Sequence, residues 1–230
     1  MKVSIIITTY NYDIYVARAI RSCIQQSFPK SDFEIIVVND SSKDSTKYIL
    51  ASYGNWIRVI ENEKNMGLPY SRNQGIRNAR GEYIVNLDAD DFLHADFINI
   101  CHLYMTFNKF DAVASDYFLI DQKEEIIGRE DCLKRPIACG IMFRRKQMIE
   151  LGMYDESLSV AEDLDFRARF DKKYNIHRIN LPLYRYRMHK NNLTRDQEKN
   201  LEYIEIVARN NGITLDHSYQ PAEIAKERKA

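Results

Sequence analysis

The chain has 230 residues, 45% of them hydrophobic and 29% charged, which suits one sizeable folded domain and excludes a disordered protein. Its 33 Lys and Arg balance 33 Asp and Glu, which excludes the chain-wide basic field of a nucleic-acid-binding protein. The four cysteines lack zinc-ligand spacing and are predicted to be reduced packing thiols. No apolar run approaches the roughly 20 residues that span a bilayer, and the apolar run at the start of the chain is too short for the core of a secretory signal. We therefore expect a cytoplasmic protein, with peripheral contact at the inner face of the membrane left open.

The first half of the chain alternates apolar runs with amphipathic stretches, a pattern typical of a buried parallel sheet flanked by helices. Strands are predicted over Val3–Thr8, Phe33–Val38, Trp56–Ile60, Tyr83–Leu87 and residues 111–119. Helices are predicted over residues 13–27, 44–53, 69–79 and 94–107. The expected fold is therefore α/β, with a Rossmann-like, mixed, mostly parallel central sheet.

The second half is less regular. Asp121–Leu133 is polar and is interpreted as a loop or hairpin. Further strands are predicted over Ile137–Phe143, Ile176–Ile179 and Leu183–Met188, and further helices over residues 145–151 and 162–172. The last two strands lie on either side of Pro182, which interrupts the pattern. Residues 196–210 are predicted to form a polar helix that packs on the core or mediates a homodimer, followed by a frayed tail.

Polar side chains follow three of the predicted strands at the point where each strand ends. Thr8 and Tyr10 close the first strand, Asp40 follows the second, and Asp88 and Asp90 follow the fourth. In an open parallel α/β sheet, ligands bind outside the carboxyl ends of the strands. We therefore expect these residues to share one edge of the sheet.

The acidic run after the fourth strand is the strongest single signal. Asp88, Asp90 and Asp91 place three carboxylates within four residues, and such groups repel one another unless a cation neutralises them. Mg²⁺ or Mn²⁺ is typically held by one or two carboxylates together with substrate phosphates. The alternative interpretation is a helix N-cap, with Asp90 or Asp91 capping a helix near Phe92.

Two other polar positions allow two interpretations each. Asp40 suits a ribose or base edge, but Asp40–Thr46 is also an ordinary capping sequence for the next helix. Arg72 lies in the first turns of a helix whose N-terminus could face a phosphate, although an isolated arginine is more often a surface residue.

The second half contains a further acidic cluster, followed by a basic one. Glu162, Asp163 and Asp165 open a predicted helix, either as favourable acids of a first turn or as the source of a general base. His189 follows a predicted strand and is interpreted as a metal ligand or a surface residue. Residues 166–190 hold eight Lys and Arg against one acid, which predicts a positive rim if they border the site.

Read in order, these segments resemble family 2 glycosyltransferases with the GT-A fold. The matching segments are Ser4–Asn11, Ile36–Asp44, Asn65–Gly67, Ser71–Asn73, Ala79–Ile84, Asp88–Asp91, Cys139–Arg145, Gly152–Glu156 and Glu162–Asp163. The resemblance covers about residues 3–192. It implies a single GT-A domain over 1–195, with a nucleotide-sugar-binding half to about 110 and an acceptor and catalytic half over about 111–195. Residues 196–230 would form a C-terminal helix and tail.

The resemblance also implies roles at the nucleotide. Thr8 and Tyr10 would line the base, Asp40 would bind the base or the ribose, and Arg72 would approach the nucleotide. Asp88 would lie near the ribose or a metal-bound water.

The chemistry implied by the resemblance centres on a divalent cation and a base. Asp90 matches the direct metal ligand, with Asp88 the first acid of the same DxD motif, and His189 falls where a histidine completes the metal site in several members. The cation would be Mn²⁺ or Mg²⁺. Asp163 matches the catalytic base of inverting members.

The implied function is inverting transfer of a sugar from a nucleotide-diphospho-sugar, expected to be UDP-linked, to a hydroxyl. The acceptor would be a glycan, a glycolipid or lipid-linked saccharide, or a polysaccharide precursor. Two alternatives stay open. One is a non-catalytic nucleotide-sugar-binding subunit. The other is a sugar-1-phosphate nucleotidyltransferase, which would carry a glycine-rich loop where this chain has Thr8–Tyr12 without glycine.

Overall fold

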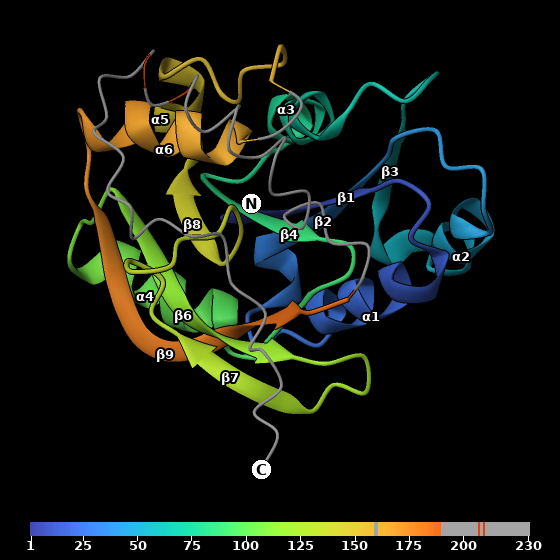
Figure 1. Cartoon of the computed structure of the whole chain (residues 1–230), viewed down its shortest axis with the longest axis horizontal. Helices are drawn as coiled ribbons and strands as arrows, with labels where there is room; N and C mark the ends of the chain where they lie inside the picture. The colour runs from blue at the N-terminus through green and yellow to red at the C-terminus, as the bar shows by residue number, and fades with distance from the viewer. Residues whose placement is uncertain (159–160, 190–206, 208, 210–230) are drawn as a thin grey trace.

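A computed structural model of the chain describes residues 1–158, 161–189, 207 and 209 (Figure 1). Within these residues the strands form one nine-stranded sheet in the order β3-β2-β1-β4-β8-β6-β9-β5, with β7 paired to β6. Helices cover both faces of the sheet (Figure 1). The predicted α/β fold with a mixed, mostly parallel sheet is confirmed.

The first four long strands make the parallel half of the sheet. They are β1 (Val3–Thr9), β2 (Phe33–Asn39), β3 (Arg58–Glu61) and β4 (Tyr83–Asp88). All seven residues of β1 are buried, because β1 lies between β2 and β4 with helices on both faces. The β-branched run at the start of the chain fits this position.

Two hydrophobic layers hold the helices on the sheet. One layer contains Ile5 and Ile7 of β1 and packs under α1 (Asp13–Ile24), α2 (Thr46–Ser52) and α4 (Phe97–Phe107). The other contains Ile6 and packs under α3 (Leu68–Asn78), α5 (Arg145–Glu150) and α6 (Glu162–Asp171). A Cβ at Gly75 of α3 would overlap the Ile6 side chain, so glycine permits this close approach of helix and strand.

The remaining strands mix directions. They are β5 (Phe92–Leu93), β6 (Ala112–Ile120), β7 (Ile126–Glu130), β8 (Ile141–Arg144) and β9 (Ile176–Arg187). β8 runs antiparallel to β4 and β6, whereas β6 and β9 are parallel. The β6–β7 pair confirms the hairpin interpretation of Asp121–Leu133.

One predicted division was wrong, and two predicted elements begin later than expected. The two strands predicted around Pro182 are one strand, because the register shifts there and the bulge accommodates a residue without an N–H. The strand predicted from Ile137 begins at Ile141. The helix predicted from residue 94 begins at Phe97, after the short strand β5.

The predicted C-terminal helix lies outside the described residues except for Val207 and Arg209. Val207 is buried and clusters with Ala161. All four cysteines are free and buried, as predicted. In the described part of the chain, no helix has the length and apolar character needed to cross a membrane.

Candidate active site

The ends of β1, β2 and β4 meet at one edge of the sheet. Thr8 is in register with Val38 of β2 and with Asp88 of β4. The backbone N–H of Asp40 donates to the Thr9 carbonyl over 2.9 Å. The structure therefore brings the predicted residues of all three strand ends together, with Tyr10 exposed just beyond them.

Asp40 is buried and organises the loop before α3. Its carboxylate accepts hydrogen bonds from Asn62 Nδ2 at 2.7 Å and from the N–H groups of Met66 and Gly67 at 2.8 Å each. The helix α2 is not capped by Asp40, because Asp44 accepts the Thr46 N–H instead. The capping interpretation of Asp40 was therefore wrong, and its contact with a base or ribose stays a prediction.

The three acids after β4 have three different environments. The Asp88 carboxylate is 32% exposed, and the Asp90 carboxylate lies 2.8 Å from His189 Nε2. Asp91 points into the core, where it accepts hydrogen bonds from the Tyr184 hydroxyl at 2.6 Å and from the Arg187 N–H at 2.8 Å. Burial and the two neighbouring carboxylates raise the pKa of Asp91.

The N-cap interpretation of this acidic run was wrong, because Phe92 opens the strand β5 and not a helix. Of the three acids, Asp88 and Asp90 are therefore the two that lie at the sheet edge where β1, β2 and β4 end. Asp91 instead fastens the same turn to β9 through Arg187.

His189 is a buried residue and not a surface one, with 5% of its area exposed. Its ring stacks on Tyr15 at a centroid distance of 5.1 Å and meets the edge of Tyr12 at 6.2 Å. Arg187 Nε donates to the Asp90 carbonyl over 2.8 Å. Arg187 and His189 thus tie the end of β9 to the turn that carries Asp90 and Asp91.

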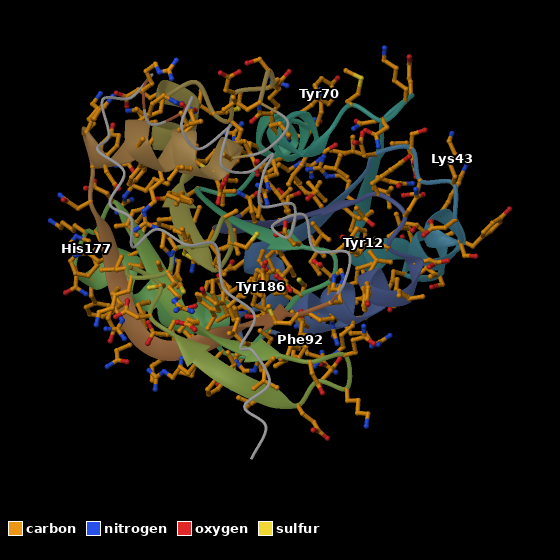
Figure 2. All side chains as sticks on the ribbon, in the orientation of Figure 1. Tyr12, Lys43, Tyr70, Phe92, His177 and Tyr186 are labelled. Carbon is orange, nitrogen blue, oxygen red and sulfur yellow. The ribbon has the colours of Figure 1, made fainter. Side chains whose placement is uncertain are left out.

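Tyr12 and Tyr15 were missed by sequence reasoning. Tyr12 lies in the loop after the first strand and Tyr15 in the first turn of α1, and the sequence pattern gave neither of them a role at the site. In Figure 2 the label of Tyr12 lies to the right of the centre of the view, and the label of Phe92 of β5 lies below it. Burial, followed by the charges of Asp90 and Asp88, raises the pKa of Tyr12, and its phenol stays protonated near the carboxylates.

Arg72 joins the acidic motif to the start of α6. Its Nη2 donates to Asp88 Oδ1 over 2.9 Å, and its Nη1 donates to the Glu162 carboxylate. The side chain is 1% exposed, so the surface interpretation of Arg72 was wrong. Its contact with a nucleotide stays a prediction.

Asp163 follows Glu162 in the first turn of α6 and is partly buried. Burial raises the pKa of the Asp163 carboxyl, while the Arg72 guanidinium opposes that shift. Burial also raises the pKa of Glu162, again against Arg72. The first turn of α6 therefore holds two carboxyl groups beside the buried guanidinium of Arg72.

The donors at this edge suit a hard divalent cation. Asp90 offers a carboxylate oxygen, which Mn²⁺ and Mg²⁺ sites accept together with substrate phosphates, and His189 Nε2 lies 2.8 Å from that carboxylate. The Asp88 carboxylate is bonded to Arg72. The pair Asp90 and His189 is therefore the part of the predicted ligand set that the structure brings into contact.

Another group of possible metal donors lies elsewhere. Among the described residues, Asp116, Asp131 and Cys132 have their donor atoms within 4.8 Å of one another. Arg178 bonds to both aspartates, and burial raises the pKa of the Cys132 thiol to about 12. This group is an ion-pair network and does not suit a cation.

The comparisons with known proteins agree with the fold. The profile of Glycosyl transferase family 2 matches residues 4–162, more than half of the chain. The chain therefore belongs to glycosyltransferase family 2. This confirms the family predicted from the motifs.

The relatives differ in length from this chain. An uncharacterized glycosyltransferase of Rickettsia typhi is 32% identical over 224 residues, which are 88% of this chain and 69% of the relative. The poly(ribitol-phosphate) beta-N-acetylglucosaminyltransferase TarS of Staphylococcus aureus is 34% identical over 126 residues, 54% of this chain and 21% of TarS. The aligned part of the chain thus corresponds to about a fifth of the length of TarS.

Two solved structures share the fold. TarS residues 1–349 in complex with UDP-GlcNAc matches with a TM-score of 0.77 and 22% identity, covering 91% of this chain and 66% of that one. The mannosyltransferase PcManGT of Pyrobaculum calidifontis, in complex with GDP-Man and Mn²⁺, matches with a TM-score of 0.68 and 18% identity, covering 84% and 59%. These likenesses confirm the GT-A fold.

Proposed function

We propose that the chain is an inverting, metal-dependent glycosyltransferase that uses a nucleotide-diphospho-sugar, with a UDP-sugar as its donor. The observation that carries the proposal is the meeting of the DxD turn, His189 and the start of α6 at one edge of the sheet. That edge follows the carboxyl ends of parallel strands, where α/β proteins bind nucleotides. Structures of TarS with UDP-GlcNAc and of PcManGT with GDP-Man support a nucleotide-sugar for the same fold.

Thr8, Tyr10 and Asp40 form the nucleoside end of the proposed site. Asp40 retains an acceptor oxygen that has one hydrogen bond, from the Gly67 N–H, and a carboxylate can accept more than one. Tyr10 is exposed and can cover a base. These contacts fix the donor so that its diphosphate faces Asp88 and Asp90.

Asp90 and His189 would hold Mn²⁺ or Mg²⁺, with Asp88 beside them. When bound there, the cation would stabilise the negative charge of the diphosphate leaving group. Arg187 fixes the backbone of Asp90, and Tyr15 fixes the imidazole plane. The protein therefore presents its two donor groups in a defined arrangement.

Asp163 acts as the general base in this proposal. Its carboxylate takes the proton from the acceptor hydroxyl while that oxygen attacks the anomeric carbon from the face opposite the leaving group. A base works best when its pKa approaches the working pH, and burial moves the pKa of Asp163 in that direction. One displacement inverts the configuration at the anomeric carbon.

The acceptor is proposed to be a hydroxyl of a glycan, a lipid-linked saccharide or a polysaccharide precursor. The likeness to TarS supports a polymeric acceptor, since TarS is named for transfer to poly(ribitol-phosphate). A non-catalytic nucleotide-sugar-binding subunit is the second candidate, favoured only by the Arg72 contact that already engages Asp88. It would bind the same donor without turnover.

A donor screen tests the proposal. Thermal unfolding is measured with UDP-GlcNAc, UDP-glucose, GDP-mannose and dTDP-glucose, each with Mn²⁺ and with EDTA. A ligand at about 100 times its Kd adds about 2.7 kcal/mol to the unfolding free energy. We expect the UDP-sugars to stabilise the protein with Mn²⁺ and much less with EDTA. Equal stabilisation with and without metal would contradict the metal assignment.

A further inference from the structure

A single buried guanidinium connects the donor side of the proposed site to the base. Arg72 contacts Asp88, which is 16 residues away, and Glu162, which is 90 residues away. Both Arg72 and Glu162 are at least 95% buried, with exposed fractions of 1% and 5%. Neither side chain can reach solvent for its hydrogen bonds.

The surroundings of Arg72 hold its position. The Tyr154 ring lies 5.5 Å from the guanidinium carbon, and Cys139 Sγ lies 3.9 Å from Nη2. Tyr154 is itself fixed by its hydroxyl, which bonds to Asn86 over 2.9 Å. The guanidinium of Arg72 is therefore held by residues of β4, the loop before β8 and the loop before α6.

At the start of α6, Ala161 packs against Val207, and Phe166 one turn later packs on Tyr154. Ala161, the residue before Glu162, has φ of +63°, a left-handed conformation that costs energy for a residue with a Cβ. No side chain caps this helix. Glu162 supplies the ion pair that joins this first turn to Arg72 and, through Arg72, to Asp88 at the sheet edge.

A buried ion pair of this kind is weak evidence for stability, because desolvation of both charges offsets their attraction. Its geometry fits a positioning role better. Glu162 adjoins Asp163 in the chain, so the contact that fixes Glu162 also fixes the backbone of the base. The same guanidinium holds Asp88 in the turn that carries Asp90.

We infer that Glu162 is a positioning residue, which acts through Arg72 to align the base Asp163 with the donor held at the DxD turn. The inference rests on the proposed function. Glu162 contacts neither the sugar nor the acceptor in this account, so donor binding should survive its replacement, whereas turnover should fall. A small displacement of a base from its substrate can slow a reaction by about 100-fold.

Glu162→Gln keeps the shape of the side chain and removes its charge. The test measures UDP release from the most stabilising UDP-sugar with Mn²⁺ and water as acceptor, the affinity for UDP with Mn²⁺ by calorimetry, and the melting temperature. We expect kcat to fall by about 10- to 100-fold while the Kd of UDP changes by less than about threefold. Glu150→Gln, at an exposed ion pair with Lys173, is the matched control and should leave both quantities unchanged.

A double-mutant cycle tests whether Glu162 acts through Arg72. If the two form one unit, Arg72→Gln and the double variant with Glu162→Gln should reduce kcat to a similar extent. Additive losses would contradict the inference. Should Glu162→Gln not fold, Glu162→Asp keeps the charge with a shorter side chain and carries the same expectation for kcat and Kd.

The outcomes separate this inference from the proposed function. A wild-type protein that releases no UDP from any donor contradicts both. Wild-type release that Glu162→Gln leaves at full rate contradicts the positioning role alone. A loss of kcat matched by an equal loss of UDP affinity also contradicts it, because Glu162 would then serve binding.

Discussion

At the scale of single residues, side chains that look like ligand groups in the sequence are partly engaged inside the protein. Asn73, next to Arg72, donates to the Tyr154 carbonyl over 2.8 Å and accepts its N–H over 3.0 Å. Asp91 is bonded within the core, and Asp40 holds the loop before α3. Motif residues thus both join the motifs to one another and shape the edge where a donor would bind.

Replacement of Asp90 tests the metal site at this scale. Asp90→Asn removes a charge from the pair with His189. We expect the affinity for UDP in Mn²⁺ to fall at least about tenfold, since loss of even a hydrogen-bond partner of a metal ligand typically costs about 10- to 100-fold in metal affinity. UDP affinity in EDTA should stay the same. Calorimetric titration measures both. Asp32→Asn, at a surface ion pair with Lys2, is the control, and an unchanged metal dependence in Asp90→Asn would refute the assignment.

The pH dependence of turnover follows from the environment of Asp163. Burial raises its pKa above the usual value of about 3.9 for aspartate, and the charge of Asp88 adds to that shift. A base must be deprotonated, so kcat should rise with pH through a pKa above that value and be lost on the acid side. Steady-state rates between pH 4 and 8 measure the profile. A rate that stays level down to pH 4 would show that no such base limits turnover.

At the scale of elements, the parallel half of the sheet was predictable because each buried strand is a continuous apolar run and each helix has one apolar face. The strand β5 was not predictable, since a strand of two residues is too short to show the alternation of apolar and polar side chains. The sequence did not predict β9 as one continuous strand, because a proline normally ends a strand. Here the register shift between β6 and β9 accommodates Pro182 within the strand.

The same distinction applies to the site. Residues that follow strands were predictable as a group, because the topology alone places strand ends at one edge. The contact between Arg72 and Glu162 was not, since it depends on how α6 returns to that edge after 90 residues of chain. Likewise, nothing in the local sequence distinguishes the buried His189 from a surface histidine.

The ion pairs between β6 and β9 give a prediction for acid stability. Asp116 is 1% exposed, and although burial opposes it, hydrogen bonds from Arg178 and Arg129 lower its pKa to about 2. A carboxyl whose pKa is lower in the folded state than in the unfolded state stabilises the fold. This contribution is complete at pH values above the unfolded-state pKa of about 4, and it is lost as the pH falls toward the folded-state pKa of about 2. Asp116→Asn should therefore lower the free energy of unfolding by about 2 kcal/mol at pH 7.

Urea unfolding at pH 7 and at pH 3 measures this effect. The difference between wild type and Asp116→Asn should shrink at the lower pH. Asp131→Asn, at the more exposed partner of Arg178, should cost less. Equal stability of Asp116→Asn and wild type at pH 7 would show that this network contributes nothing net to the fold.

At the scale of the whole molecule, the neutral charge is a balance of local pairs. The basic run over residues 166–190 was expected to form a positive rim, but many of its charges are paired. These pairs are Arg167 with Asp171, Arg169 with Asp165, Lys173 with Glu150, Arg178 with Asp116 and Arg187 with Glu124. The expectation of a free basic rim is therefore not supported by the described residues.

This distribution predicts weak binding to polyanions. Affinity for nucleic acid comes mainly from unpaired Lys and Arg that neutralise phosphates, and it falls steeply with salt. We expect the protein to pass a heparin column unretained at 150 mM NaCl and to show no binding to duplex DNA in a gel-shift assay. Retention that requires several hundred millimolar salt for elution would contradict the predicted absence of a nucleic-acid partner.

The most direct test of the central claim, that this edge transfers a sugar with Asp163 as base, separates binding from turnover in Asp163→Asn. UDP release from a UDP-sugar with Mn²⁺ is followed beside calorimetric binding of UDP. The account predicts that the variant binds UDP like wild type and releases it at least about 100-fold more slowly, the usual contribution of a general base. Release by Asp163→Asn at the wild-type rate would contradict it.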